Sequence, residues 1–122
     1  MKNAVLLAVL GLVVIGAVYW FGMSRGTVVG EESYTCADNK SIEAVFYEGK
    51  QVEVAPGERP VPTGSVTLVL SDKRRLTLPQ TLSASGVRYA NKDESFIFWT
   101  KGETAFVVEG DTETYRECVE QE

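Results

Sequence analysis

The sequence predicts an all-β domain behind an N-terminal apolar helix. After Gly26, apolar residues recur at every second position in short runs, and glycine or proline separates these runs. Several such strands in fewer than 100 residues are typical of an antiparallel sandwich or a closed barrel. Cys36 and Cys118 lie near the two ends of this region. A bond between them would tie the first strand to the last and help to close a barrel.

The N-terminal segment predicts export from the cytoplasm. Residues 4–23 form an apolar run of 20 residues without a charged side chain, which is long enough to cross a bilayer as a helix. Lys2 favours a cytoplasmic start, so we expect an inner-membrane anchor that places the domain in the periplasm. The alternative is a signal peptide cleaved near Gly22–Ser24, although this run exceeds the usual core of about 7–15 residues. We assign 1–26 to the anchor or signal, 27–32 to a short linker and 33–122 to one domain.

Six alternating runs are predicted to be strands, and we expect six to eight strands in all. They lie at 40–48, 66–70, 76–78, 94–101, 104–109 and 113–119. Ser71–Arg74 is expected to be a hairpin turn, although Lys73 is a poor substitute for glycine there. Residues 55–64 hold three prolines and two glycines and are expected to be an exposed connector. In the loop 81–89, small polar residues beside Gly86 allow the backbone to approach another surface closely.

Composition and charge exclude several classes of function. Beyond residue 30 there are 10 basic and 17 acidic residues, which give a formal charge of −7. Such a surface repels nucleic acid and attracts cationic partners. The chain has no histidine, which excludes a histidine triad and a histidine-ligated metal, and we expect no metal and no cofactor. Cys36 and Cys118 are too far apart for a CxxC motif and are interpreted as one structural disulfide; a pair of buried free thiols is the alternative.

Two short motifs resemble a known family. Residues 85–89 read S-G-V-R-Y, and residues 98–102 read F-W-T-K-G. With Tyr34-Thr35-Cys36 before them and Cys118 after them, they resemble the S-G-x-x-Y and F-W-x-K-G signatures of the membrane-bound and periplasmic inhibitors of C-type lysozyme. The resemblance extends over residues 33–119.

The resemblance implies a small antiparallel β-barrel of about eight strands, closed by one disulfide bond, that acts as a plug in lysozyme. It implies that Ser85 and Lys101 enter the active-site cleft of the C-type lysozyme, and that Gly86 and Tyr89 complete this lysozyme-binding loop. Membrane-bound members are usually lipoproteins, and this chain has no lipid-accepting cysteine directly after its apolar run. The expected mode of anchoring therefore departs from that of the family.

Other interpretations of these residues stay open at this point. Arg88 alternates with Tyr89, so one of the two should face solvent, and we assign no role to Arg88. Trp99 is expected in the core or beside it. Serine and lysine could instead form a catalytic dyad, which needs a desolvated lysine, or the barrel could be a structural or ligand-carrying envelope protein. A barrel of about eight strands is filled by its own side chains, so we expect the functional residues to lie on loops. We expect the protein to be a monomer or a dimer.

Overall fold

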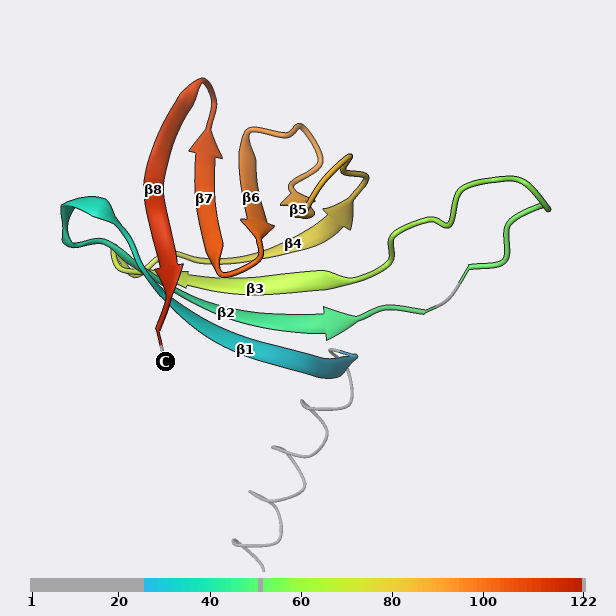
Figure 1. Ribbon diagram of the computed structural model, residues 1–122, viewed down its shortest axis with the longest axis horizontal. Helices are drawn as coiled ribbons and strands as arrows, with labels where there is room; N and C mark the ends of the chain where they lie inside the picture. The colour runs from blue at the N-terminus through green and yellow to red at the C-terminus, as the bar shows by residue number, and fades with distance from the viewer. Residues whose placement is uncertain (1–25, 51, 122) are drawn as a thin grey trace, which may run out of the picture.

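The strands close into a barrel. The computed structural model describes residues 26–50 and 52–121, and in it each strand pairs antiparallel with the next while β8 pairs back with β1 (Figure 1). The strands are β1 (Thr27–Thr35), β2 (Ser41–Glu48), β3 (Ser65–Leu70), β4 (Arg75–Thr81), β5 (Val87–Ala90), β6 (Phe96–Lys101), β7 (Thr104–Glu109) and β8 (Thr112–Glu120). A short 3-10 helix, η1 (Ala37–Asn39), connects β1 to β2. The prediction of an all-β barrel of about eight strands is confirmed, and the sandwich is excluded.

The predicted anchor at residues 4–23 lies outside the described residues. Within 26–50 and 52–121, no helix is both long and apolar enough to span a bilayer.

Alternate residues of each strand point inward and fill the barrel, as the sequence pattern predicts. Phe98 is fully buried at its centre, with ring centroids 6.0 Å from Tyr34, 6.4 Å from Phe46 and 6.2 Å from Tyr89. The predicted inward stripes of β2 and β3 are also buried at Ile42, Ala44, Val66, Leu68 and Leu70. Phe46, the last residue of the predicted β2 stripe, is partly buried and packs against this core. Burial of these apolar surfaces is the main favourable term in the folding of the domain.

Local turn chemistry decides where the strands end. β6 begins at Phe96, two residues after the predicted start, because Glu94 has a positive φ of 57° and the Asn91 side chain accepts the N–H of Phe96 at 3.0 Å. The predicted hairpin turn Ser71–Arg74 is present. Lys73 adopts φ 74° there, which is the left-handed conformation that glycine takes more readily.

The assignment of 27–32 to a linker is wrong. β1 begins at Thr27 and pairs with β2 from Thr27↔Glu48 onward. The strand was not recognised because Val28 and Val29 are adjacent, so apolar residues do not alternate with polar ones there. In the structure these two side chains are 50% and 61% exposed. The short strand β5 was not predicted either, since four residues carry too little alternation to be recognised.

One seam of the barrel is narrow. β1 and β8 are paired only at Tyr34↔Glu120 and Thr35↔Val119. The predicted disulfide bond between Cys36 and Cys118 lies directly beside these pairs and is present. The covalent link therefore closes the barrel at one of its two shortest strand pairings, since β4 and β5 are also paired at only two positions.

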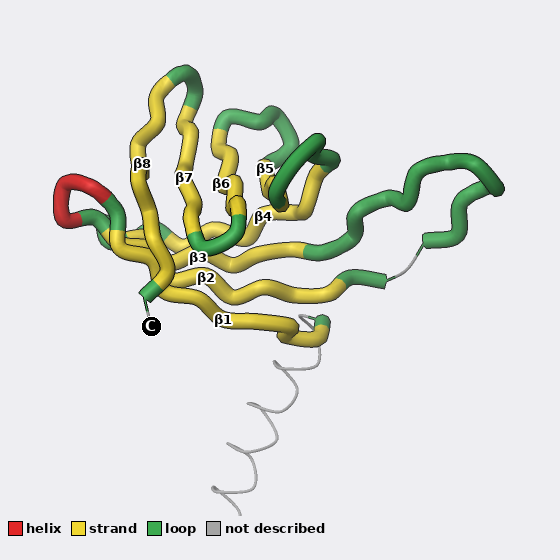
Figure 2. Tube along the Cα trace, viewed as in Figure 1, coloured by secondary structure: helices red, strands yellow, loops and turns green. Residues whose placement is uncertain are grey.

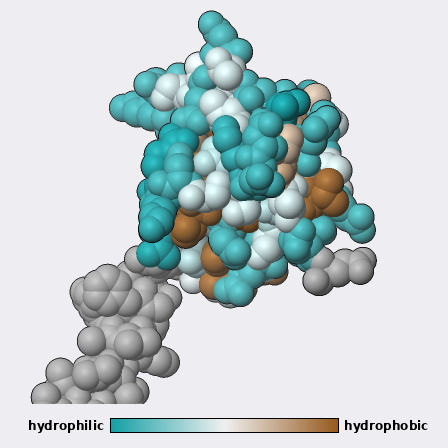
Figure 3. All heavy atoms as spheres, turned by 90° about the vertical axis from the view of Figure 1, so that its left-hand side faces the viewer, coloured by the Kyte–Doolittle hydropathy of each residue, from teal (hydrophilic) through white to brown (hydrophobic). Residues whose placement is uncertain are grey.

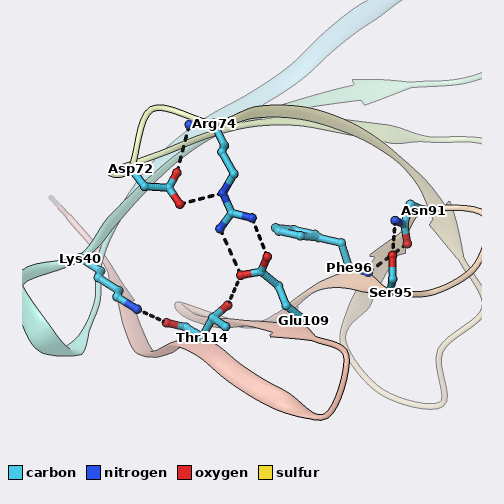
Figure 4. Close-up of polar contacts among 8 residues, drawn as sticks. All are labelled: Lys40, Asp72, Arg74, Asn91, Ser95, Phe96, Glu109 and Thr114. Carbon is cyan, nitrogen blue, oxygen red and sulfur yellow. Dashed lines mark hydrogen bonds and ion pairs between the residues drawn. The ribbon is translucent and has the colours of Figure 1, made fainter.

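The surface outside the barrel is mostly polar. The connector between β2 and β3 projects away from the strands (Figure 2). Residues 55–64 of it contain no strand, as predicted. The face beside β8 and η1 is largely hydrophilic, with separate small hydrophobic spots (Figure 3). A polar network around Arg74 crosses one end of the barrel, where η1 and the β3–β4 and β7–β8 turns lie (Figure 4).

Candidate functional site

The predicted site residues come together at the other end of the barrel. The loop 82–86 leaves β4 and enters β5, and β5 pairs with β6 through Val87↔Thr100. This register places Gly86 beside Lys101, at the end of β6. Ser85, Gly86 and Lys101 are all exposed. The fold thus brings the two separate sequence motifs into one surface site.

Gly86 makes this proximity possible. A Cβ atom at this position would lie 2.3 Å from the carbonyl oxygen of Thr100 and 2.8 Å from Cγ of Lys101, and its φ is 69°. Both conditions favour glycine, which has no side chain and adopts positive φ without steric cost. The sequence predicts that the backbone at Gly86 closely approaches another surface, and in this structure that surface is β6 of the same chain.

Hydrogen bonds hold the loop in place. The indole Nε1–H of Trp99 donates to the carbonyl oxygen of Ser85 at 2.9 Å, and the hydroxyl of Ser83 donates to the same oxygen. Below the loop, Nη1 of Arg88 donates to the hydroxyl of Thr81 at 2.8 Å. The bond from Trp99 joins the loop to β6, the bond from Ser83 lies within the loop, and the bond from Arg88 joins β5 to β4. The exposed Ser85 hydroxyl is therefore attached to a fixed backbone.

Lys101 occupies the start of a tight turn. The hydroxyl of Thr104 donates to the carbonyl oxygen of Lys101 at 2.9 Å, and Gly102 takes φ 58°. The ammonium group lies 5.1 Å from the ring centroid of Trp99, a distance at which a cation is attracted to the face of an aromatic ring. The backbone of Lys101 is therefore fixed while its charge stays exposed.

Tyr89 contributes from below the surface. It is only 6% exposed and packs against Phe46 and Phe98, with ring centroids 5.8 Å and 6.2 Å away. Burial raises the pKa of its phenol, so the group is neutral at pH 7. Tyr89 thus anchors β5 in the core behind the loop, which matches a role in shaping the loop rather than in surface contact.

Sequence reasoning missed the roles of two residues. Arg88 does point outward, opposite to Tyr89, but its side chain is only 14% exposed because it pairs with Glu94 at 3.0 Å and covers Trp99. Trp99 lies on the outer face of β6, where it contacts both motifs. Its place inside F-W-T-K-G was the available signal, but the contacts depend on cross-strand register, which the sequence alone does not give.

Acidic residues lie near the turn that follows Lys101. The N–H of Glu120 donates to the carbonyl oxygen of Glu103 at 2.9 Å, which places the end of β8 against the turn that carries Lys101. Partial desolvation raises the pKa of the Glu120 carboxyl, and the neighbouring charges of Glu32 and Glu103 add to this shift. Several acidic residues therefore lie close to the turn that follows Lys101. Within 26–50 and 52–121, no three acidic, cysteine or histidine side chains are grouped as a metal site.

Comparison with known proteins gives a family match over most of the described barrel. Residues 34–115 match the family described as "Membrane-bound lysozyme-inhibitor of c-type lysozyme". A protein of Yersinia enterocolitica (serotype O:8 / biotype 1B), named membrane-bound lysozyme inhibitor of C-type lysozyme, is 45% identical over 53 residues. The aligned segment spans 43% of this chain and 43% of that relative, which is less than half of either. No solved structure matches the chain significantly.

Proposed function

The chain belongs to the family of membrane-bound lysozyme inhibitors of C-type lysozyme, and from this premise we propose that its barrel inhibits C-type lysozyme by placing Lys101 and Ser85 in the active-site cleft. In this proposal the ammonium group occupies the place of the sugar between the catalytic carboxyl groups. The enzyme can then no longer hydrolyse the bacterial cell wall. Gly86 and Tyr89 act indirectly, since one allows the close approach of the loop and the other supports it.

The chemistry of the target favours a lysine. Lysozyme cleaves its substrate with two carboxyl groups, one acid with a raised pKa and one that stays ionised. An ammonium group offers three donors and a positive charge. At an effective dielectric constant near 20, one ion contact at ~4 Å is worth about 4 kcal/mol of gross attraction. Desolvation of the ammonium cancels much of this gain, so the remaining affinity must come from fixed geometry.

The observation that carries the proposal is an exposed Lys101 beside an exposed Ser85 on a backbone that is already fixed. Gly86 lies against β6, and the Ser85 carbonyl is bonded to Trp99. A loop that is ordered before binding loses little conformational entropy on binding. This arrangement suits a plug that enters a preformed cleft.

The charge of the domain supports the same partner. Ten basic and 17 acidic residues follow residue 30, and a negative surface speeds its encounter with a cationic protein such as C-type lysozyme. Carboxylates around Lys101 would face the cationic surface outside the cleft, while Lys101 itself faces the anionic cleft.

Two other functions fit the residues less well. A serine–lysine dyad needs a lysine that is desolvated, whereas Lys101 is exposed; the inhibitor therefore should not react with a serine-directed fluorophosphonate. A structural or ligand-carrying barrel would show no effect on lysozyme. Both alternatives are separated from inhibition by simple assays on the purified full-length protein.

We further propose that residues 4–23 anchor the barrel in the inner membrane, with the domain in the periplasm. The 20-residue uncharged run supports this placement. An anchored protein should stay in the membrane fraction in high salt and require detergent for release. A shortened mature mass and recovery in the soluble periplasmic fraction would instead indicate a cleaved signal peptide.

Replacement of Lys101 tests the inhibitory mechanism. Lys101→Ala should weaken inhibition of C-type lysozyme by about 2–5 kcal/mol, the usual loss when one member of a buried charge pair is removed. The inhibition constant is measured by titrating the full-length protein into a cell-wall lysis assay. Lys92→Ala is the matched control, because Lys92 is also exposed but lies in the β5–β6 turn at the opposite end of the barrel.

The outcomes separate function from mechanism. Lack of inhibition by the parent protein would contradict the function itself. Equal inhibition constants for the parent and Lys101→Ala, with inhibition retained, would leave the function intact and remove Lys101 from the cleft. Equal losses in Lys101→Ala and Lys92→Ala would show that the effect does not depend on the position of the lysine, and would contradict a specific role of Lys101 in the cleft.

A further inference from the structure

One side chain contacts both halves of the proposed site. Trp99 donates its Nε1–H to the carbonyl oxygen of Ser85 at 2.9 Å. The same ring lies 5.1 Å from the ammonium nitrogen of Lys101. Ser85 belongs to the loop 82–86, whereas Lys101 is the last residue of β6, and Trp99 contacts both.

The orientation of this indole is itself fixed. Trp99 is paired with Phe106 on β7, and their rings stack with centroids 5.8 Å apart and planes at 28°. The guanidinium group of Arg88, across from Trp99 on β5, lies 5.8 Å from the ring centroid. Arg88 is held in turn by Thr81 and Glu94, at 2.8 Å and 3.0 Å. Support from both neighbouring strands leaves the indole N–H directed at the loop.

We infer that Trp99 is a positioning residue: it orders the Ser85 loop and the Lys101 side chain in the free protein, in the geometry that the lysozyme cleft receives. This inference rests on the proposed function for its biological role. The ordering itself is a property of the free barrel. An indole N–H is a donor only, so a hydrogen bond to a backbone carbonyl fixes the path of the loop without requiring any particular side chain at residue 85.

The first test measures loop order without lysozyme. Trp99→Phe keeps an aromatic ring for Phe106, Arg88 and Lys101 but removes the N–H donor. Hydrogen exchange of full-length protein should become at least about fivefold faster at backbone amides of 82–86, because a bond that held the loop is lost. Exchange in the core strands should stay unchanged. The Lys101 ε-methylene protons should keep their upfield ring-current shift in Trp99→Phe and lose it in Trp99→Leu.

A control on the same strand separates positioning from general destabilisation. Ile97→Ala removes apolar surface from the outer face of β6, two residues farther from the site. It should lower overall stability without a selective increase of exchange at 82–86. If Trp99→Leu does not fold, Trp99→Phe still decides the question, since it retains the stacked ring.

The second test measures binding to C-type lysozyme. Trp99→Phe should weaken binding roughly three- to tenfold, because the loop must then be ordered during association. In a Lys101→Ala background Trp99→Leu should cost less than in the parent, since part of its effect acts through the contact between the ring and Lys101. Strict additivity, with loop exchange unchanged, would identify Trp99 as a direct lysozyme contact and overturn the inference.

The two proposals fail in different ways. Unchanged exchange at 82–86 in Trp99→Phe overturns the positioning role whatever lysozyme does. Selective loosening of the loop in a protein whose parent form does not bind lysozyme would support the positioning role and contradict the proposed inhibition.

Discussion

At the scale of single residues, the geometry of the site depends on the lack of a side chain at Gly86. Gly86 lies so close to β6 that a Cβ atom would overlap the carbonyl oxygen of Thr100. By contrast, Gly110 in the β7–β8 turn also has a positive φ, 62°, but a Cβ atom there would have no other atom within 4 Å. Comparison of substitutions at the two glycines therefore distinguishes the cost of a positive φ from the cost of a steric overlap.

Gly86→Ala should displace the Ser85 loop. The left-handed backbone costs an alanine about 1–2 kcal/mol, and the overlap with Thr100 must be relieved by movement of the loop. We expect inhibition of lysozyme to fall at least about tenfold, measured as the inhibition constant. Gly110→Ala carries the same backbone cost without the overlap, so it should lower stability to urea by a similar 1–2 kcal/mol and leave inhibition unchanged. Equal inhibition by the parent and Gly86→Ala would show that the loop position does not matter.

At the residue level, the resemblance of two motifs to the family's signatures predicts Ser85, Gly86 and Lys101 as site residues. The structure places these three residues side by side, and their role in binding stays a prediction. The partly covered Arg88 was not foreseen, because alternation alone assigns a residue to a face and does not show what covers that face. That cover comes from Trp99, and it depends on the register Arg88↔Trp99.

At the scale of elements, the alternation of apolar and polar residues predicted the strands that show this pattern over several residues. It did not predict the outer half of β1 or the short strand β5. β2, β3 and β7 lie where the pattern predicts them. The outer half of β1 is paired with β2 but exposes its valines, so its pattern does not resemble that of a half-buried strand. β5 is short, and its outward residue is a charged side chain that packs on an aromatic ring.

Two hairpins are joined by a charged network at the end of the barrel away from the site (Figure 4). Arg74, the last residue of the β3–β4 turn, donates to Asp72 at 2.7 Å and to Glu109 of β7 at 3.1 Å. The hydroxyl of Thr114 on β8 donates to Glu109 at 2.6 Å. The guanidinium also lies 5.8 Å from the Phe96 ring centroid. The network thus covers one end of the apolar core and connects β3–β4 with β7–β8.

Stability should depend on pH through Glu109. The hydrogen bond from Arg74 lowers the pKa of its carboxyl, with a further contribution from Thr114. A carboxyl whose pKa is lower in the folded state stabilises the fold above its unfolded pKa of about 4.3, and this stabilisation is lost as pH falls through the folded pKa. The free energy of unfolding should therefore decrease between about pH 5 and pH 3.

Glu109→Gln should remove part of that decrease. The expected loss at pH 7 is about 1 kcal/mol, because the ion pair is partly exposed to solvent, and the difference from the parent should vanish near pH 3. Urea denaturation at both pH values measures it. Glu113→Gln, an exposed acid on the same hairpin, should follow the parent curve. A Glu109→Gln curve parallel to that of the parent would show that other carboxyl groups, Asp72 included, carry the pH dependence.

At the scale of the whole molecule, closure of the barrel links stability to the site. β1 and β8 share only two residue pairs, and the disulfide between Cys36 and Cys118 lies beside them. The same end of β8 is bonded to the turn that carries Lys101, through the N–H of Glu120 and the carbonyl of Glu103. Opening of this seam would therefore free both the edge of β8 and its contact with that turn. The sequence predicts the covalent link, but it does not predict how short the pairing beside it is, because register across the seam is set by the tilt of the closed barrel.

Reduction of the disulfide should cost about 4–5 kcal/mol of unfolding free energy, as estimated from the entropy of closing a loop of this length in the unfolded chain. A domain of this size has a small core, so the loss is a large share of its stability, and the β1–β8 seam should open first. The Cys36→Ala/Cys118→Ala variant, compared with the parent in urea with and without reductant, measures the cost.

Inhibition of lysozyme by this double variant should fall along with hydrogen-exchange protection of β8. Reductant should leave the double variant unaffected, which controls for effects of the reductant other than reduction of this disulfide. In the inhibition assay, lysozyme is added only after the reductant has been removed. If the variant loses less than about 1 kcal/mol and keeps full inhibition, the two backbone pairs and the core would suffice to close the barrel, and the disulfide would have no part in holding the lysine turn.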